Sequence, residues 1–235
     1  MNVYQEQFSK YAELSKRKYK SYYELSTKVK STMLPKNFKP VANAVIVVGF
    51  SGNGKSTWVD RFVESNPDYT IISMDEVIFA LFNKLKRNPT PAEVMKEFGD
   101  RIDKNCSLQK NVVIDGNFLN LLTRAALIDT VKTYGYQINL VNITNKIMEV
   151  LPTRIMDVAS EKLNVRLNDE NNINYANNPI YIDTKKEVIE SYLKEREESN
   201  IKEQLLLDLL SLGADKVFDE KTPFEEIVKG SSEQR

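Results

Sequence analysis

The chain has 235 residues, of which 41% are hydrophobic and 28% are charged, and its 33 basic residues balance its 33 acidic ones. It has no His and a single Cys, Cys106, which excludes a His general base, a Ser-His-Asp triad, a His-ligated metal and an internal disulfide. The composition is that of a soluble globular protein long enough to bury a large core. The N-terminus lacks the apolar run of a secretory signal, and no apolar stretch reaches membrane-spanning length. We therefore expect a cytoplasmic protein without a membrane partner.

The balanced total hides a segregation of charge. Residues 1–43 carry nine basic and three acidic residues and five of the 11 tyrosines, whereas residues 183–235 carry 14 acidic and nine basic residues. A basic, Tyr-rich segment can contact phosphates and stack on bases. It can equally be an amphipathic helix whose Tyr/Leu stripe packs on the main domain, and we favour this second interpretation. We expect a helical extension and linker over residues 1–43 and a main domain over residues 44–235.

After residue 43, short runs rich in Val and Ile alternate with helical patterns. The predicted strands are Ala44–Gly49, Tyr69–Met74, Asn111–Asp115 and Gln137–Ile143, with a late fifth strand at Asp215–Phe218. The helical patterns between them are Lys55–Glu64, Asp75–Leu85, Pro91–Cys106 and Leu121–Tyr134. Strands apolar on consecutive residues suit a parallel sheet that is buried on both faces. The alternation predicts an α/β three-layer sandwich with about five parallel strands. A further helical pattern covers Thr184–Leu212. Its apolar second half could pack on the sheet or contribute to a subunit interface.

The first strand runs into the sequence GFSGNGKST, which satisfies the pattern G-x-x-x-x-G-K-[ST]. Glycines let the backbone curl so that N–H groups form an anion nest, and the following helix points its positive end at the same place. We therefore predict a nucleotide triphosphate site in which Lys55 contacts the β- and γ-phosphates and the Ser56 hydroxyl contacts Mg²⁺. The predicted binding residues are Gly49, Ser51, Gly52, Asn53, Gly54, Lys55, Ser56 and Thr57.

Two carboxylates follow predicted strands, at the edge of a parallel sheet where ligands bind. Asp115 ends the third strand, where an acidic residue commonly holds Mg²⁺, although it could instead cap the next helix. Asp75 follows the second strand and is either a helix N-cap or a general base beside the γ-phosphate. Because the chain has no His, a carboxylate must accept any proton near neutral pH, and this favours Asp75 as the base.

The run GFSGNGKSTW, then SMDE, then VVIDGNFLN with Arg124 beyond it resembles the P-loop kinases of the polynucleotide-kinase and zeta-toxin type. The resemblance spans about residues 44–220 and implies phosphorylation of a hydroxyl with ATP and Mg²⁺. It implies that Asp75 is the base and that lid arginines neutralise phosphate charge in the transition state. The candidates are Arg154 and Arg166, with a lid near residues 154–180, in which Asn164–Asn178 is rich in Asn.

The sequence departs from this family at one informative position. In phage polynucleotide kinases an Arg lies three residues after the catalytic Asp, and here that residue is Ile78. The acceptor is therefore open between a polynucleotide 5′-hydroxyl or other nucleic-acid hydroxyl, which we favour, and a small molecule such as a nucleotide sugar. A third interpretation is a nucleotide-dependent binding module in which residues 1–43 bind nucleic acid or a partner and ATP acts as a switch. The guanine-reading pattern N-K-x-D fails at Met148, which agrees with ATP as the donor.

Overall fold

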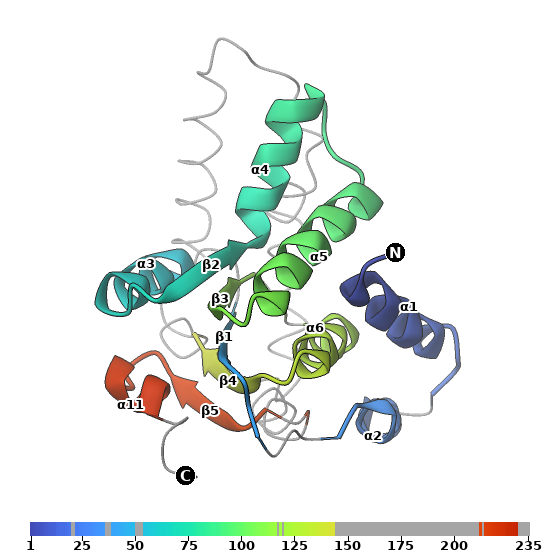
Figure 1. Cartoon of the computed structure of the whole chain (residues 1–235). Coiled ribbons are helices and arrows are strands. Elements are labelled where there is room, and N and C mark those ends of the chain that lie inside the picture. The colour runs from blue at the N-terminus through green and yellow to red at the C-terminus, as the bar shows by residue number, and fades with distance from the viewer. Residues whose placement is uncertain are drawn as a thin grey trace, which may run out of the picture.

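The computed structural model describes residues 1–19, 22–35, 39–49, 54–116, 118, 120–143, 212 and 214–229. The described residues form a parallel sheet with helices on both faces (Figure 1). Its strands are β1 (Asn43–Val48), β2 (Tyr69–Ser73), β3 (Asn111–Asp115), β4 (Gln137–Asn142) and β5 (Lys216–Asp219). Their order is β2-β3-β1-β4-β5, and every neighbouring pair is parallel. The predicted α/β sandwich with about five parallel strands is thus confirmed.

The strands form where consecutive apolar residues can be buried on both faces of the sheet. Five of the six residues of β1 are buried, and Ile46 lies in register with Ile114 on one side and Leu140 on the other. Alternate residues enter two separate apolar clusters, with Ile46 in one and Val45 in the other. A strand buried in this way needs no polar alternation, which explains the continuous Val/Ile runs of the sequence.

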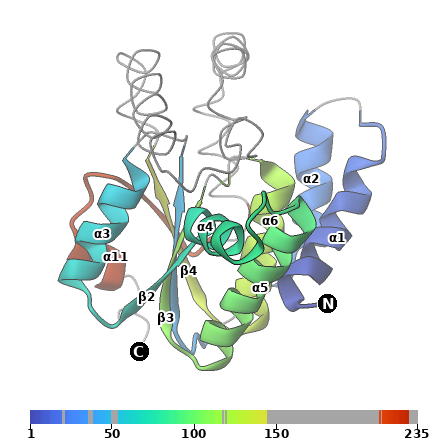
Figure 2. The ribbon, with the colours of Figure 1, turned by 90° about the horizontal axis from the view of Figure 1, so that it is seen from above.

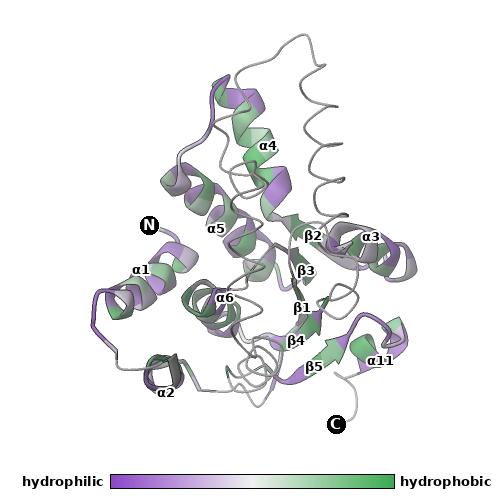
Figure 3. Cartoon of the chain, turned by 180° about the vertical axis from the view of Figure 1, so that it is seen from behind, coloured by the Kyte–Doolittle hydropathy of each residue, from purple (hydrophilic) through white to green (hydrophobic). Residues whose placement is uncertain are grey.

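The two faces of the sheet carry different helices (Figure 2). One face packs against α3 (Lys55–Ser65) and α11 (Phe224–Lys229), where Trp58, Phe62, Tyr69 and Phe224 form an aromatic cluster. The opposite face packs against α4 (Met74–Leu85), α5 (Pro91–Ser107) and α6 (Leu121–Thr133). In Figure 3 the central strands are green, whereas α1 and α5 show both colours along their length, as amphipathic helices do.

The N-terminal residues form α1 (Val3–Ser15) and α2 (Tyr22–Thr32), which lie outside α6 (Figures 1 and 2). Tyr4 and Tyr11 are 1% and 0% exposed and join the same apolar cluster as the sheet. The expected packing of an amphipathic N-terminal helix is therefore confirmed for α1. The interpretation that Tyr4 and Tyr11 stack on bases is wrong, because their buried rings cannot contact a ligand.

The last strand begins one residue later than expected, at Lys216. Asp215 instead fixes the approach to β5, because its backbone N–H donates to the carbonyl of Ile138 and its carboxylate accepts from the N–H of Ile138, both at 2.8 Å. Within the described part of the chain, no helix is long and apolar enough to cross a membrane.

Candidate active site

The carboxyl ends of β1, β3 and β2 lie next to one another, because β3 pairs with both of the other strands. Asp115, the last residue of β3, lies in register with Val47 near the end of β1 and with Ser73 at the end of β2. The phosphate loop follows β1, and Asp75 comes two residues after β2. The topology therefore brings the predicted phosphate loop, Asp115 and Asp75 to one edge of the sheet.

The phosphate loop ends in a glycine whose backbone is left-handed. Gly54 has φ 84° and ψ 17° and is the N-cap of α3, with no side-chain capping hydrogen bond. The first N–H groups of a helix lack intrahelical partners, so this end of α3 offers donors and a positive dipole to an anion. Gly49, Gly54, Lys55, Ser56 and Thr57 lie in the described part, and Ser51, Gly52 and Asn53 lie outside it.

The Ser56 hydroxyl donates to a carboxylate oxygen of Asp115 at 3.0 Å, which joins the start of α3 to the end of β3. Asp115 is only 5% exposed, and among the described residues its other oxygen, Oδ1, has no hydrogen-bond partner. Burial raises the pKa of the Asp115 carboxyl, while the Lys55 ammonium and the Ser56 hydroxyl act in the opposite direction and the carboxylates of Asp75 and Asp60 add to the rise. The site thus holds a buried carboxylate, that of Asp115, whose charge is favoured by Lys55 and disfavoured by burial and by two neighbouring carboxylates.

These two oxygen-bearing side chains suit Mg²⁺. The ion prefers carboxylate and hydroxyl oxygens, and in phosphate sites it is held by one or two protein groups while water and phosphate supply the remaining ligands. The unpartnered Oδ1 of Asp115 is the atom that such an ion would satisfy. Among the described residues, no three His, Cys, Asp or Glu side chains gather as a metal cluster.

The helices that follow the two candidate carboxylates are capped by other residues. Ser73 is the N-cap of α4, and its hydroxyl accepts from the N–H of Glu76 at 3.3 Å. Asn120 caps α6, and its side chain accepts from the N–H groups of Leu122 and Thr123 at 2.9 and 3.2 Å. The interpretation of Asp75 and Asp115 as N-caps is therefore wrong.

The second strand also ends earlier than expected, so that Asp75 lies in the first turn of α4. Asp75 is exposed at the carboxyl edge of the sheet. Neither carboxylate is committed to capping a helix, and both are left available for other roles.

A further feature of this edge was not predicted as a site. After Asp115 the chain passes through Gly116, Phe118 and Asn120, and Phe118 has φ 43°, a left-handed conformation that bulky side chains rarely adopt. Its carbonyl accepts from Nη1 of Arg124 at 2.8 Å, and the Arg124 side chain is fully buried. The sequence signals were an Arg within the apolar run LLTRAALI and a Gly directly after Asp115.

Several predicted residues fall outside the described residues. They are Arg154, Arg166 and the lid near residues 154–180. Their assignment to the site stays a prediction.

Residues 45–146 match the family model of an AAA domain, which covers less than half of the chain. A search among curated proteins finds no match. The parallel sheet and the complete phosphate-loop pattern between β1 and α3 give the middle of the chain the fold of a P-loop nucleotide-binding domain. The narrower resemblance to polynucleotide kinases is not part of the family match.

Three solved structures are similar to the chain. One is a provisionally assigned kinase from Chloroflexus aurantiacus J-10-fl, with 14% identity over 53% of this chain and 70% of that chain and a TM-score of 0.41. The second, from the PezAT chromosomal toxin-antitoxin system of Streptococcus pneumoniae, has 18% identity over 70% of this chain and 66% of that chain and a TM-score of 0.39. The third is a gluconokinase from Sinorhizobium meliloti 1021, with 16% identity over 83% of this chain and 93% of that chain and a TM-score of 0.40. Likenesses this weak say nothing about the substrate of this chain.

Proposed function

We propose that the chain is an ATP- and Mg²⁺-dependent phosphotransferase that moves the γ-phosphate of ATP to a hydroxyl acceptor. The observation that carries this proposal is the hydrogen bond from Ser56 to the buried carboxylate of Asp115, beside the Lys55 ammonium. A hydroxyl and a carboxylate joined at the foot of a phosphate-binding helix are the parts that hold Mg²⁺ on a nucleotide triphosphate.

The roles of the side chains follow from their charge and place. The N–H groups at the start of α3 and the Lys55 ammonium bind the phosphates and oppose the negative charge of the transition state. Ser56 and Asp115 would hold Mg²⁺, which would neutralise phosphate charge. Asp75 takes the proton from the acceptor hydroxyl as its oxygen bonds to the γ-phosphorus and the bond from that phosphorus to ADP breaks. Arg154 and Arg166 are proposed as lid cations.

The test exchanges the proposed base for an amide of the same shape. Asp75→Asn is expected to bind Mg²⁺–ATP as the wild type does, while transfer falls by about two to four orders of magnitude, the range typical for a lost general base. The only Trp of the chain, Trp58, lies three residues after Lys55 and is 8% exposed, so we expect its fluorescence to change on nucleotide binding. Glu76→Gln is the matched control, because Glu76 is the neighbouring exposed acid in the same helical turn. Transfer by Asp75→Asn at the wild-type rate would remove Asp75 from the mechanism.

The acceptor class is proposed on the surface charge of the N-terminal helices. Among the described residues of the N-terminal 43, six cations are exposed: Lys16, Arg17, Lys18, Lys28, Lys30 and Lys39. They favour an acceptor with a phosphate backbone, and we propose a polynucleotide 5′-hydroxyl or another nucleic-acid hydroxyl as the first class to test. The burial of Tyr4 and Tyr11 removes two candidate stacking groups and keeps a nucleotide sugar as the alternative.

A panel assay with γ-labelled ATP separates these acceptors. It compares 5′-hydroxyl DNA, 5′-hydroxyl RNA, hydroxymethyl-base DNA and nucleotide sugars. Label in an oligonucleotide supports the first class, and label in a nucleotide sugar supports the second. Nucleotide-dependent retention of DNA or RNA without transfer to any acceptor would instead indicate a binding module.

A further inference from the structure

The turn that follows Asp115 occupies a central place in the candidate site. We refer to its described residues Gly116, Phe118 and Asn120 as the Phe118 turn. Because β3 lies between β1 and β2, this turn lies between the phosphate loop and the end of β2 that leads to Asp75. An acceptor hydroxyl that reaches both the γ-phosphate and Asp75 would therefore lie at the same edge of the sheet as the Phe118 turn.

The backbone of the turn is held in an unfavourable conformation. Phe118 has φ 43°, yet its ring is only 4% exposed and packs in the core. A Cβ added at Gly116 would approach Cζ of the Phe118 ring to 2.6 Å, so the ring lies against the glycine backbone. Backbone strain of this kind persists only where surrounding contacts enforce it, and such strain gathers at functional sites.

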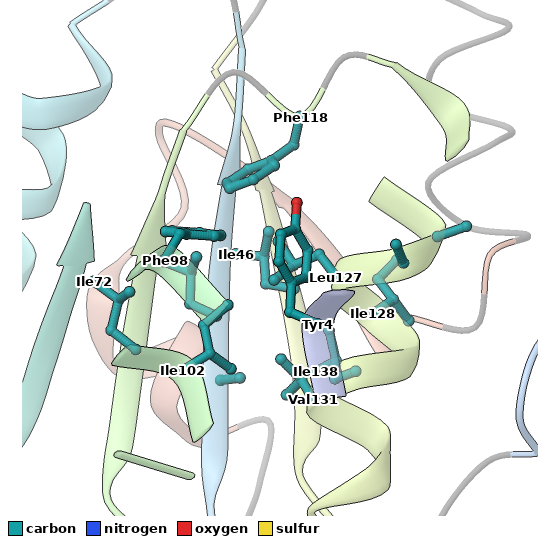
Figure 4. Packing of buried hydrophobic residues seen from close by; sticks show 14 of the residues in the cluster. Tyr4, Ile46, Ile72, Phe98, Ile102, Phe118, Leu127, Ile128, Val131 and Ile138 are labelled. Atoms are coloured by element: carbon teal, nitrogen blue, oxygen red, sulfur yellow. The ribbon is translucent and has the colours of Figure 1, made fainter. Parts of the chain in front are cut away.

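Two independent contacts enforce the strained turn. The first is polar: Nη1 of the fully buried Arg124 donates to the carbonyl of Phe118 at 2.8 Å. The second is aromatic: the ring centroid of Phe98 on α5 lies 6.1 Å from that of Phe118. Figure 4 shows Phe118 at one end of the cluster, above Phe98 and Ile46.

The aromatic contact continues to the N-terminal helix. Tyr4 of α1 meets Phe98 edge-to-face, with ring centroids 5.4 Å apart. In Figure 4 the Tyr4 hydroxyl is directed toward the end of the cluster where Phe118 lies. The Phe98 ring therefore lies between two others, with Tyr4 packed on one part of it and Phe118 on another.

The position of Tyr4 is itself fixed on two helices. At its start, α1 is attached to α5, where Asn2 donates to Asp100 at 2.9 Å and the N–H of Val3 donates to Asp103 at 3.1 Å. Further along, Lys10 and Tyr11 donate to Asp129 of α6 at 2.8 and 2.6 Å. A helix held in this way cannot shift without moving the rings that lie beneath it.

We propose that α1 is part of the acceptor site, because it holds the Phe118 turn in place through Tyr4 and Phe98. This inference rests on the proposed function and adds to it a positioning role for the N-terminal residues. Tyr4 and Phe98 are positioning residues, since they act through Phe118, and Arg124 fixes the same turn from α6. The group that the turn orients is the hydroxyl-bearing part of the acceptor, not the nucleotide.

The experiment compares two substitutions in α1 of the full-length chain. Tyr4→Leu removes the ring that packs on Phe98. Tyr11→Phe is the matched control, because it weakens the attachment of α1 through Asp129 and leaves the contact with Phe98 intact. Hydrogen exchange of peptides that contain Phe118 is measured in both variants, together with nucleotide affinity from Trp58 fluorescence and transfer to the panel acceptors.

The expected result is specific to Tyr4. Relative to the change in global stability of each variant, Tyr4→Leu should speed exchange in the peptides that contain Phe118 by about tenfold or more, whereas Tyr11→Phe should speed it no more than its global destabilisation does. Tyr4→Leu should raise the acceptor KM several-fold and leave the ATP affinity within about twofold of the wild type. Phe118→Leu should have the same acceptor effect and make Tyr4→Leu ineffective in the double variant.

Equal exchange in the two single variants would overturn the proposal, as would a loss of ATP affinity equal to the loss of acceptor affinity. Transfer by the wild type to no panel acceptor, with nucleotide binding intact, would count against the proposed function. In that case the exchange comparison still decides whether α1 holds the Phe118 turn.

Discussion

The hydroxyl of Tyr11 donates a 2.6 Å hydrogen bond to the carboxylate of Asp129, inside the interface between α1 and α6. Asp129 is fully buried and also accepts from Lys10 Nζ at 2.8 Å and from the N–H of Leu34 at 3.0 Å. All three of these donors come from the first 35 residues of the chain. A buried carboxylate is tolerated only when it is paired and hydrogen-bonded, so α6 and the N-terminal helices depend on each other for stability.

Removal of the Tyr11 hydroxyl should destabilise the whole protein. Tyr11→Phe keeps the ring in the core and deprives Asp129 of one donor, at an expected cost of about 1–3 kcal/mol in the free energy of unfolding. Urea unfolding followed by circular dichroism measures this loss. Ser15→Ala removes an exposed hydroxyl from the same helix and should change stability by less than about 0.5 kcal/mol. Unfolding midpoints that coincide for the two variants would contradict a stabilising role for Asp129.

Acid should weaken the start of α5 through Glu93. The Arg87 guanidinium, the backbone N–H of Thr90 and the Thr90 hydroxyl lower the pKa of the Glu93 carboxyl from 4.5 to about 2. Because the folded-state pKa lies below the unfolded one, this contribution to stability is fully present above about pH 4.5 and is lost as the pH falls toward 2.

The measurement is the urea midpoint between pH 2 and pH 7 at low and high salt. Glu93→Gln should flatten the fall in stability below about pH 4.5, and salt should reduce the difference because the pair is at the surface. Glu6→Gln, at an exposed glutamate of α1, is the control. A Glu93→Gln variant that loses stability with acid as steeply as the wild type would remove Glu93 from the acid response.

The sequence predicts the sheet well because its signals are local. Buried strands appear as short Val/Ile runs, and the third strand, Asn111–Asp115, was predicted with its observed ends. The second strand was placed one residue too long because Ser73 and Asp75 can both cap a helix. The capping pattern S-x-x-E, formed by Ser73 and Glu76, indicates the correct cap, since the Ser73 hydroxyl accepts from the N–H of Glu76.

The remainder depends on contacts between distant parts of the chain. Asp129 and Lys132 lie on α6 and would face water in an isolated helix, yet they are buried and bonded to Tyr11 and Leu34 from the N-terminal residues. Arg124 is buried on the same helix, where it donates to the carbonyl of Phe118. The left-handed conformation of Phe118 could not be predicted either, because Arg124 within an apolar run and Gly116 only mark the place, and the contacts of Phe118 with Arg124 and Phe98 form only in the folded chain. A single sequence reveals which residues form the phosphate loop, but not which distant helix supports the turn beside it.

A substitution at Gly54 tests the backbone of the phosphate loop. Gly54 has φ 84°, and a Cβ added there would meet nothing within 4 Å, so the cost of Gly54→Ala is purely conformational. We expect a loss of about 1–2 kcal/mol in the free energy of unfolding and weaker ATP binding as the start of α3 shifts. Gly54→Asn should lose less, because Asn tolerates the left-handed region. Equal losses for the two variants would show that backbone conformation is not the reason for glycine here.

The metal-binding role of Ser56 is tested by the magnesium dependence of nucleotide binding. In Ser56→Ala the buried Asp115 loses the hydroxyl that donates to it, and a bound Mg²⁺ would lose one oxygen ligand. We expect the affinity for ATP with Mg²⁺ to fall by about tenfold, or about 1.4 kcal/mol, and the affinity in EDTA to change little. Trp58 fluorescence titrations in the two conditions measure this difference.

Asp60→Asn is the matched control for Ser56→Ala. Asp60 is an exposed carboxylate on the same helix, and its charge also acts on Asp115. If charge alone governed the site, removal of this carboxylate would alter magnesium-dependent binding as much as the loss of the Ser56 hydroxyl. We expect only a small change, within about threefold, because long-range pairs of partly exposed charges are screened. A Ser56→Ala variant that loses equal affinity with Mg²⁺ and with EDTA would place Ser56 on the phosphate and not on the ion.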